Sequence, residues 1–272
     1  MNSLKYITLL FFALLTISCE DVIHVDVPTG TPRLVVDASI NWEIGETGNE
    51  QTIRLTTTAG FYDPSVPAVS GATVSVTNTD TNTVFSFVEN PGTGNYICSN
   101  FEPVIGGNYE LTIIHDGQTY TATEKLMPVV PIDKIEQKDD GGFTGEDIEI
   151  KVFFTDPGDA DNFYMFRYKP SFTAIPLYGI TEDEFYQGNQ FSDFFTHEDL
   201  ESGNQLDITI YGISEQYYNY MNLLLDVADP GGPFSTTPSK VKGNIVNTTD
   251  SKNIAFGYFR LSQTATENYL VQ

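Results

Sequence analysis

Apolar and polar residues alternate in short runs along most of this chain, which predicts β-strands. Every second side chain is apolar in residues 72–76 and again in residues 148–154, so each run has one apolar face. Glycine, asparagine and aspartate interrupt the runs at intervals of about eight to twelve residues. Asp116-Gly117 is the strongest of these turn signals and predicts a hairpin. This pattern favours an immunoglobulin-like β-sandwich over residues 33–127.

A proline-bounded segment, residues 127–131, separates this half from the rest of the chain, and we place a domain boundary there. Residues 132–272 also carry alternating runs and predict a second, β-rich domain. One α-helix is expected at about 213–228, where apolar residues recur at helical spacing and Ser214 is placed to act as the N-cap. Residues 175–200 have weak periodicity, and we interpret them as a long loop with short helical pieces.

The amino terminus has a different pattern, a single charge followed by an unbroken apolar run. Lys5 is the only charged residue among residues 1–18, and the run extends from Tyr6 to Ile17. As a helix this run would span roughly 18 Å, which is too short for a bilayer core that needs about twenty residues. A charged start, a short apolar centre and small residues after it are typical of a secretory signal peptide.

The end of this segment has the sequence LTISC, in which Cys19 follows Ser18. It resembles a lipobox, where a lipoprotein signal peptidase cuts before a cysteine that carries lipid. Residues 1–18 would then be removed, and acyl chains such as palmitate on Cys19 would attach the tether of residues 19–32 to a membrane. Two or three acyl chains make such attachment effectively permanent. The alternative is an ordinary signal peptide followed by a chance cysteine.

Two acidic residues, Glu20 and Asp21, come directly after this cysteine. Acidic residues at this place resemble the surface-export signal of Bacteroidota lipoproteins. The resemblance implies a protein held to the outer membrane by lipid and exposed on the cell surface. The alternative is an acidic, solvated tether on the periplasmic face of the membrane.

The composition excludes some partners. The chain has 13 Lys and Arg against 37 Asp and Glu, a formal net charge of −24, so it repels phosphate backbones and nucleic-acid binding is not expected. Once Cys19 carries lipid, Cys98 is the only cysteine left, and no intrachain disulfide can form. Cys98 lies in a strand-like segment, and we expect a buried, unreactive thiol rather than a nucleophile.

No enzyme motif is present in the sequence: there is no His-Glu-x-x-His, no Gly-x-Ser-x-Gly and no phosphate-binding loop. His197 is the one histidine with several carboxylates nearby in sequence, and we expect it to be a solvated loop residue. Asp156, Asp159 and Asp161 crowd one loop and are a weak candidate for calcium. Their register fails the twelve-residue calcium loop, so we expect no catalytic residue, no metal and no cofactor beyond the lipid on Cys19.

Aromatic residues are concentrated between residues 178 and 195. They have two interpretations, filler of the core or lining of a cleft or protein-facing surface. Interfaces are enriched in tyrosine and phenylalanine. We therefore take Phe191, Phe194 and Phe195 as a candidate partner surface, with core packing as the alternative.

Three segments of the first half resemble a known kind of sandwich. They read SGATV at residues 70–74, GNY at residues 94–96 and GGNYEL at residues 106–111. They are similar to the repeats of carboxypeptidase-regulatory-like and other transthyretin-like domains. The resemblance implies a sandwich fold and says little about function.

The chain as a whole resembles an uncharacterised family of Bacteroidota outer-membrane lipoproteins, a domain of unknown function. Genes of this family often lie beside those of TonB-dependent receptors, which implies a non-enzymatic accessory or ligand-capture role in nutrient uptake. The alternatives are a structural or adhesive cell-surface protein and a surface hydrolase. The resemblance transfers no site residue. It rests on Cys19-Glu20, residues 34–36, the sandwich segments, Asp156 with residues 162–164, and residues 243–245 and 257–259.

The lipidation hypothesis predicts the behaviour of a single substitution. Cys19→Ser removes the thiol that would carry lipid, so the variant should accumulate as precursor or as soluble protein. Metabolic labelling with a clickable palmitate analogue measures this directly. Equal labelling of the wild type and the variant would contradict the hypothesis.

Overall fold

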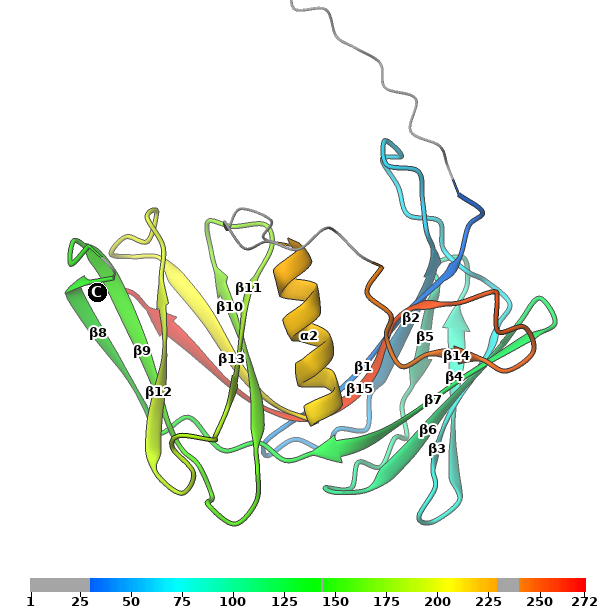
Figure 1. Ribbon diagram of the computed structural model, residues 1–272, viewed down its shortest axis with the longest axis horizontal. Helices are drawn as coiled ribbons and strands as arrows, with labels where there is room; N and C mark the ends of the chain where they lie inside the picture. Colours follow the sequence, from blue (N-terminus) through cyan, green and yellow to red (C-terminus); the bar gives the residue numbers. More distant parts are fainter. Residues whose placement is uncertain (1–29, 143, 229–239) are drawn as a thin grey trace, which may run out of the picture.

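The computed structural model describes residues 30–142, 144–228 and 240–272. Within these residues the protein is mostly β, and the only helix is α2 (Figure 1). The prediction of a mostly β fold with one clear helix is therefore confirmed. The predicted signal peptide, Cys19, Glu20 and Asp21 lie outside the described residues.

Seven strands make up the first half of the chain. The predicted Asp116-Gly117 hairpin is confirmed between β6 and β7, because both residues have positive φ, at 48° and 71°, as a two-residue turn of this type requires. The strands are β1 (Leu34–Glu43), β2 (Gln51–Thr57), β3 (Thr73–Asn78), β4 (Thr83–Asn90), β5 (Asn95–Cys98), β6 (Asn108–His115) and β7 (Gln118–Met127).

The second half contains the other strands and the helix. Strands β12, β9 and β8 form a separate three-stranded sheet in that order, while β11, β10 and β13 belong to the large sheet. The elements are β8 (Lys134–Gly141), β9 (Asp147–Thr155), β10 (Phe163–Pro170), β11 (Leu177–Glu182), β12 (Gln190–Thr196), β13 (Gln205–Ile213), α2 (Glu215–Ala228), β14 (Val246–Asn247) and β15 (Phe256–Leu270).

Strand β15 is hydrogen-bonded to strands of both halves. Its residues 256–264 lie parallel to residues 35–43 of β1, and its residues 264–270 lie antiparallel to residues 205–211 of β13. A short parallel pairing with β7 closes the first half on itself. In Figure 1 the red strand runs beneath the helix from one half to the other. The large sheet is thus continuous across the predicted boundary at residues 127–131, and both that boundary and the immunoglobulin-like sandwich stay predictions.

Two main hydrophobic cores lie on either side of this junction. The first is built from the alternate residues of β1 to β7, together with Phe259 and Leu261 of β15. The second lies between the three-stranded sheet and β10 and β13, and Val271 just after β15 belongs to it. The carboxyl end of the chain therefore contributes apolar side chains to both cores.

The interpretation of residues 175–200 as a loop with short helical pieces is wrong. Strand β11 pairs with β10 along residues 177–182, and strand β12 pairs with β9 along residues 190–196. Backbone pairing to a neighbouring strand supplies hydrogen bonds that cannot be predicted from the local sequence. Alternation is weak because Phe194 and Phe195 are adjacent apolar residues on opposite faces of β12.

Helix α2 begins where the sequence predicts. The Ser214 Oγ accepts a hydrogen bond from the backbone N–H of Tyr217 at 3.2 Å, the geometry of an N-cap. Met221 is the buried residue of the helix, and it packs with Met165 and Tyr211 of the sheet. One face of α2 therefore lies against β10 and β13, and the helix becomes one wall of a groove.

The junction between β1 and β15 predicts a strong effect of one methyl group. Gly257 has a φ of +94°, and a Cβ there would lie 1.9 Å from the carbonyl oxygen of Val36. Gly257→Ala should therefore lower the free energy of unfolding by more than about 3 kcal/mol. Urea unfolding of the purified protein measures the loss.

Gly71→Ala is the matched control, because Gly71 also has positive φ, +74°, but a Cβ there meets nothing within 4 Å. It should lose only about 1 kcal/mol, the usual strain of a left-handed residue. Equal losses in the two variants would show that the close approach of β15 to β1 is not a stability constraint.

Candidate functional site

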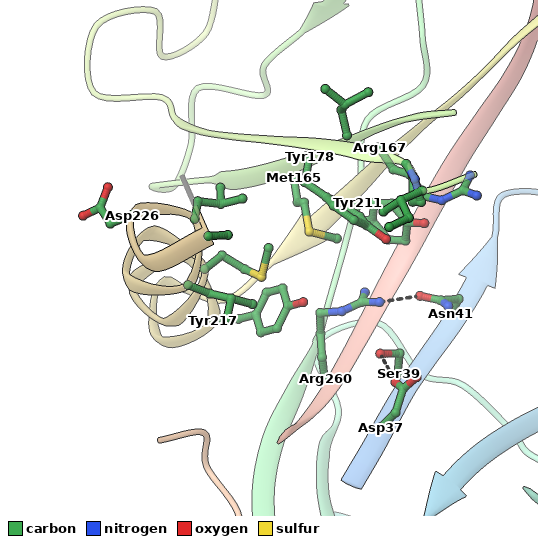
Figure 2. Close-up of a pocket in the computed structure, with 17 residues that line it drawn as sticks. Asp37, Ser39, Asn41, Met165, Arg167, Tyr178, Tyr211, Tyr217, Asp226 and Arg260 are labelled. Atoms are coloured by element: carbon green, nitrogen blue, oxygen red, sulfur yellow. Dashed lines mark hydrogen bonds between the residues drawn. The ribbon is translucent and has the colours of Figure 1, made fainter. Parts of the chain in front are cut away.

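A groove of about 1260 Å³ lies between helix α2 and the large sheet, and we call it the α2 groove (Figure 2). Strands β1, β10, β13 and β15 supply its polar and aromatic floor. The helix and the segment 175–178 form its sides. The groove therefore lies where the two halves of the chain meet, next to the shared strand.

The sides of the α2 groove are apolar. Met221, Leu224 and Leu225 line it from the helix, and Met165 lines it from β10. Residues Ile175, Leu177 and Tyr178 at the opposite side are exposed large hydrophobic side chains. Exposed apolar side chains gathered around a concavity are typical of ligand-binding sites.

Arg260 lies in the floor of the groove. Its side chain comes from β15 and is only 4% exposed. The Nη2 donates a hydrogen bond to the Oδ1 of Asn41 at 2.8 Å. The guanidinium carbon lies 4.9 Å from the ring centroid of Tyr211 and 5.3 Å from that of Tyr217, so both rings offer cation–π contacts. Figure 2 shows the Tyr217 hydroxyl pointing toward it.

Arg260 forms no direct ion pair with a carboxylate within 4.0 Å among the described residues, although its charge opposes the burial that raises the pKa of Glu124, a carboxylate on β7 beside the helix. Its Nε and Nη1 are buried and have no hydrogen-bond partner in the same part of the chain. Burial of a charged group without a partner is unfavourable and is rare in folded proteins.

A second arginine lines the same groove. Arg167 lies two residues after Met165 on β10, so alternation places both on the face that borders the groove. The chain has only four arginines, and two of them line this one site. Asp37 and Asp226 also line it, and the Ser39 hydroxyl donates a hydrogen bond to Asp37 at 2.9 Å.

A polar network attaches the first turn of α2 to the first half of the chain. The carboxylate of Glu124 on β7 accepts hydrogen bonds from the Ser214 hydroxyl at 3.0 Å and from the Tyr258 hydroxyl at 3.2 Å. Tyr217 and Tyr220 each place a ring 4.8 Å from that of Tyr258. Burial raises the pKa of Glu124, and its hydrogen bonds oppose that shift. These contacts fix the helical wall of the groove.

The residues that the sequence singled out for chemistry do not gather at the groove. The Nδ1 of His197 accepts a hydrogen bond from the backbone N–H of Asp199 at 3.1 Å, beside the ring of Phe172. Cys98 is buried in the first core, as expected. Neither side chain lines the α2 groove.

The weak calcium candidate is explained by internal hydrogen bonds. Asp156 is buried, and it accepts hydrogen bonds from the Tyr164 hydroxyl at 2.7 Å and from the backbone N–H of Gly188 at 3.0 Å. Asp159 and Asp161 are exposed. Within residues 30–142, 144–228 and 240–272 no group of three metal-ligating side chains is present. Asp156 therefore has a structural role in closing this loop.

One member of the candidate partner surface requires correction. Phe195 is 5% exposed and stacks on Tyr168 in the second core, so it cannot belong to an exposed surface. Phe194, on the opposite face of β12, is 56% exposed, and Phe191 stacks on Tyr186 at 4.0 Å while remaining partly exposed. Only Phe191 and Phe194 remain available to a partner.

Sequence reasoning missed both arginines of the groove. A signal for Arg260 was present, because it is the only charged residue in the strongly apolar segment 254–261. A lone arginine in such a segment predicts a buried or paired charge. Nothing comparable marks Arg167, whose position beside the groove depends on the pairing of β10 with β13.

The chain belongs to a family of unknown function. The family model described as "Domain of unknown function (DUF4249)" matches residues 20–268. No curated protein matches the chain. Among the described helices, none is both long and apolar enough to cross a membrane.

Several solved structures are similar in part. The FN1–FN3 domains of chicken CNTN1 are 15% identical with a TM-score of 0.27, and the match covers 68% of this chain. It covers 62% of the CNTN1 chain, so this protein spans less than two thirds of that length. A two-domain fibronectin type III segment of chicken tenascin is 15% identical with a TM-score of 0.22, over 66% of this chain and 90% of that one. A DUF4785 protein of Legionella pneumophila is 6% identical with a TM-score of 0.27, over 66% and 52%. At these TM-scores the similarities carry no argument about function.

The Glu124 network predicts a pH-dependent effect on stability. Because the folded state raises the pKa of Glu124 above its ordinary value of 4.5, the carboxyl group stabilises the fold below that pH. This contribution is lost as pH rises through the folded-state pKa. A Glu124→Gln variant is neutral at every pH, so its thermal midpoint should rise relative to wild type between pH 4 and pH 7.

Glu89→Gln should show the opposite trend. The backbone N–H of Gly71 donates a hydrogen bond to Glu89 and lowers its pKa, so this carboxylate stabilises the fold above its ordinary pKa. The thermal midpoint of Glu89→Gln should therefore fall relative to that of the wild type as pH rises. If the thermal midpoints of the two variants changed with pH in the same direction relative to wild type, the assignment of Glu124 as a buried, destabilised carboxylate would be contradicted.

Proposed function

We propose that this protein captures a ligand in the α2 groove and holds it without chemical conversion. The observation that carries this proposal is Arg260, a buried cation with unpartnered donors in the floor of an open, partly apolar groove. Buried donors that lack partners lower the stability of the folded chain. A ligand that pairs with them recovers the lost interaction energy.

The side chains of the groove favour binding over catalysis. Eight of the 17 lining residues are tyrosine, methionine or leucine, which supply contact area, and two are arginines, which supply orientation. The carboxylates of Asp37 and Asp226 lie on separate elements, β1 and α2. The Ser39 hydroxyl donates a hydrogen bond to Asp37, but the lining residues that the structure describes include no histidine, cysteine or lysine, the groups that most often serve as base or nucleophile in hydrolytic mechanisms.

The proposal extends to the place where the protein acts. A lipid on Cys19 would attach the chain to the outer membrane, and Glu20 with Asp21 would direct it to the cell surface. This is supported by the amino-terminal sequence and by the resemblance to Bacteroidota lipoproteins. There the protein would act as a non-enzymatic accessory that delivers its ligand to a TonB-dependent receptor. Phe191 and Phe194 are the proposed contact with that receptor.

A groove-filling substitution tests the capture function. Ser39 lies on β1 and lines the groove, so the side chain of Ser39→Trp would occupy ligand space. Purified protein is incubated with a small-molecule extract of spent culture medium and desalted. Native mass spectrometry then detects any adduct. Wild type should retain an adduct that Ser39→Trp loses.

Ser86→Trp is the control, because Ser86 is an exposed strand residue on β4, outside the groove. It should retain the adduct as wild type does. Loss of the adduct in both variants would point to an unspecific effect of tryptophan. Retention by Ser39→Trp, or no adduct on wild type, would contradict capture in this groove.

A further inference from the structure

Resting on the proposed function, we infer that the ligand of the α2 groove is an amphipathic carboxylate, a molecule with one carboxylate joined to an apolar body. The inference comes from the distribution of charge and apolar surface in the groove. The carboxylate would lie at the floor against Arg260 and Arg167. The apolar body would lie along the helix.

The hydrogen-bond donors in the floor of the groove favour an anionic ligand. Arg260 is buried, its Nε and Nη1 have no partner in the described chain, and its one hydrogen bond goes to the neutral amide of Asn41. A guanidinium presents its donors in one plane, which matches the two oxygens of a carboxylate. The rings of Tyr211 and Tyr217 contact the guanidinium at 4.9 and 5.3 Å without neutralising its charge.

Arg167 adds a second positive charge above this floor. Figure 2 shows its side chain on the same side of the groove as Tyr211, across from the helix. The Tyr211 ring lies 4.9 Å from the guanidinium carbon of Arg260, and the positive charges of both arginines oppose the burial that raises the pKa of Tyr211. One carboxylate can therefore meet positive charge from two strands, β10 and β15.

The same groove disfavours several negative charges on one ligand. Asp37 and Asp226 line it, and the whole chain has a formal net charge of −24. A phosphate dianion or a polycarboxylate would meet this field as well as the arginines. Because the two aspartates already offset the two arginines in formal charge, each further negative charge on a ligand adds to an excess, and a ligand with a single carboxylate adds the least.

The apolar sides of the groove favour a ligand with an apolar body. Met165, Met221, Leu224 and Leu225 line its helical side as one apolar surface, and methionine side chains adapt to varied shapes. The volume of about 1260 Å³ exceeds that of many small-molecule sites, so the body can be extended. Either a free organic acid or the carboxyl terminus of a short apolar peptide has this chemistry.

Calorimetric titration with matched probes tests the inference on the full-length mature chain. The probes are 4-phenylbutyrate, its neutral analogue 4-phenylbutyramide, phenyl phosphate, and the tripeptide Ala-Leu-Phe with a free or an amidated carboxyl terminus. The butyrate or the free-acid peptide should bind at least about tenfold more tightly than its neutral partner. Preference for the butyrate identifies a free acid, and preference for the peptide identifies a peptide terminus.

Three Arg→Met variants assign the binding to the groove. Arg260→Met should weaken binding of the preferred acid at least about tenfold, and Arg167→Met should weaken it severalfold. Arg54→Met removes an exposed arginine of β2 outside the groove and should bind as wild type does. The thermal midpoint of Arg260→Met should not fall, because the substitution removes an unpaired buried charge. If Arg260→Met does not fold, Arg167→Met decides.

The outcomes separate this inference from the capture function. Equal binding of acid and neutral probes, or tighter binding of phenyl phosphate, would overturn the carboxylate assignment. So would acid binding that Arg260→Met and Arg167→Met leave unchanged. In each case the adduct lost by Ser39→Trp would still support capture of another ligand. If wild type and Ser39→Trp did not differ in the adduct that they retain, the capture function itself would be overturned.

Discussion

The pairing of strand β15 with both halves of the chain is the constraint on which the rest of the structure depends. Its first part is held parallel to β1 and its last part antiparallel to β13, so a single strand completes the large sheet. The close approach at Gly257 makes this pairing intolerant of any side chain there. Because the strand contributes apolar residues to both cores, neither half can be complete without the carboxyl end of the chain.

The α2 groove is a consequence of this shared strand. Arg260 belongs to the part of β15 that pairs with β1, yet its guanidinium lies under Tyr217 of the helix and beside Tyr211 of β13. Asn41 of β1 holds one of its nitrogens. A site built from residues far apart in sequence therefore depends on the correct register of one strand. Because Arg260 belongs to this strand, the free-energy cost of burying its unpaired charge opposes the folding of the same strand.

The sequence was sufficient for features that are local. Alternating residues, the Asp116-Gly117 turn and the Ser214 cap predicted strands, a hairpin and a helix that the structure contains. It was insufficient for β11 and β12, whose hydrogen bonds come from neighbouring strands. Phe195 was misplaced for the same reason, since its burial is decided by pairing with β9. Arg260 and Asn41 are 219 residues apart, and nothing local in the sequence relates them.

Native-state hydrogen exchange of the backbone amides in β1 and β13 tests the central claim most directly. If β15 binds the halves into one cooperative unit, the most protected amides of both strands should exchange through the same global opening. Their opening free energies should then agree and fall together with added urea. Amides of β13 that open at a much lower free energy, while those of β1 stay protected, would contradict the account.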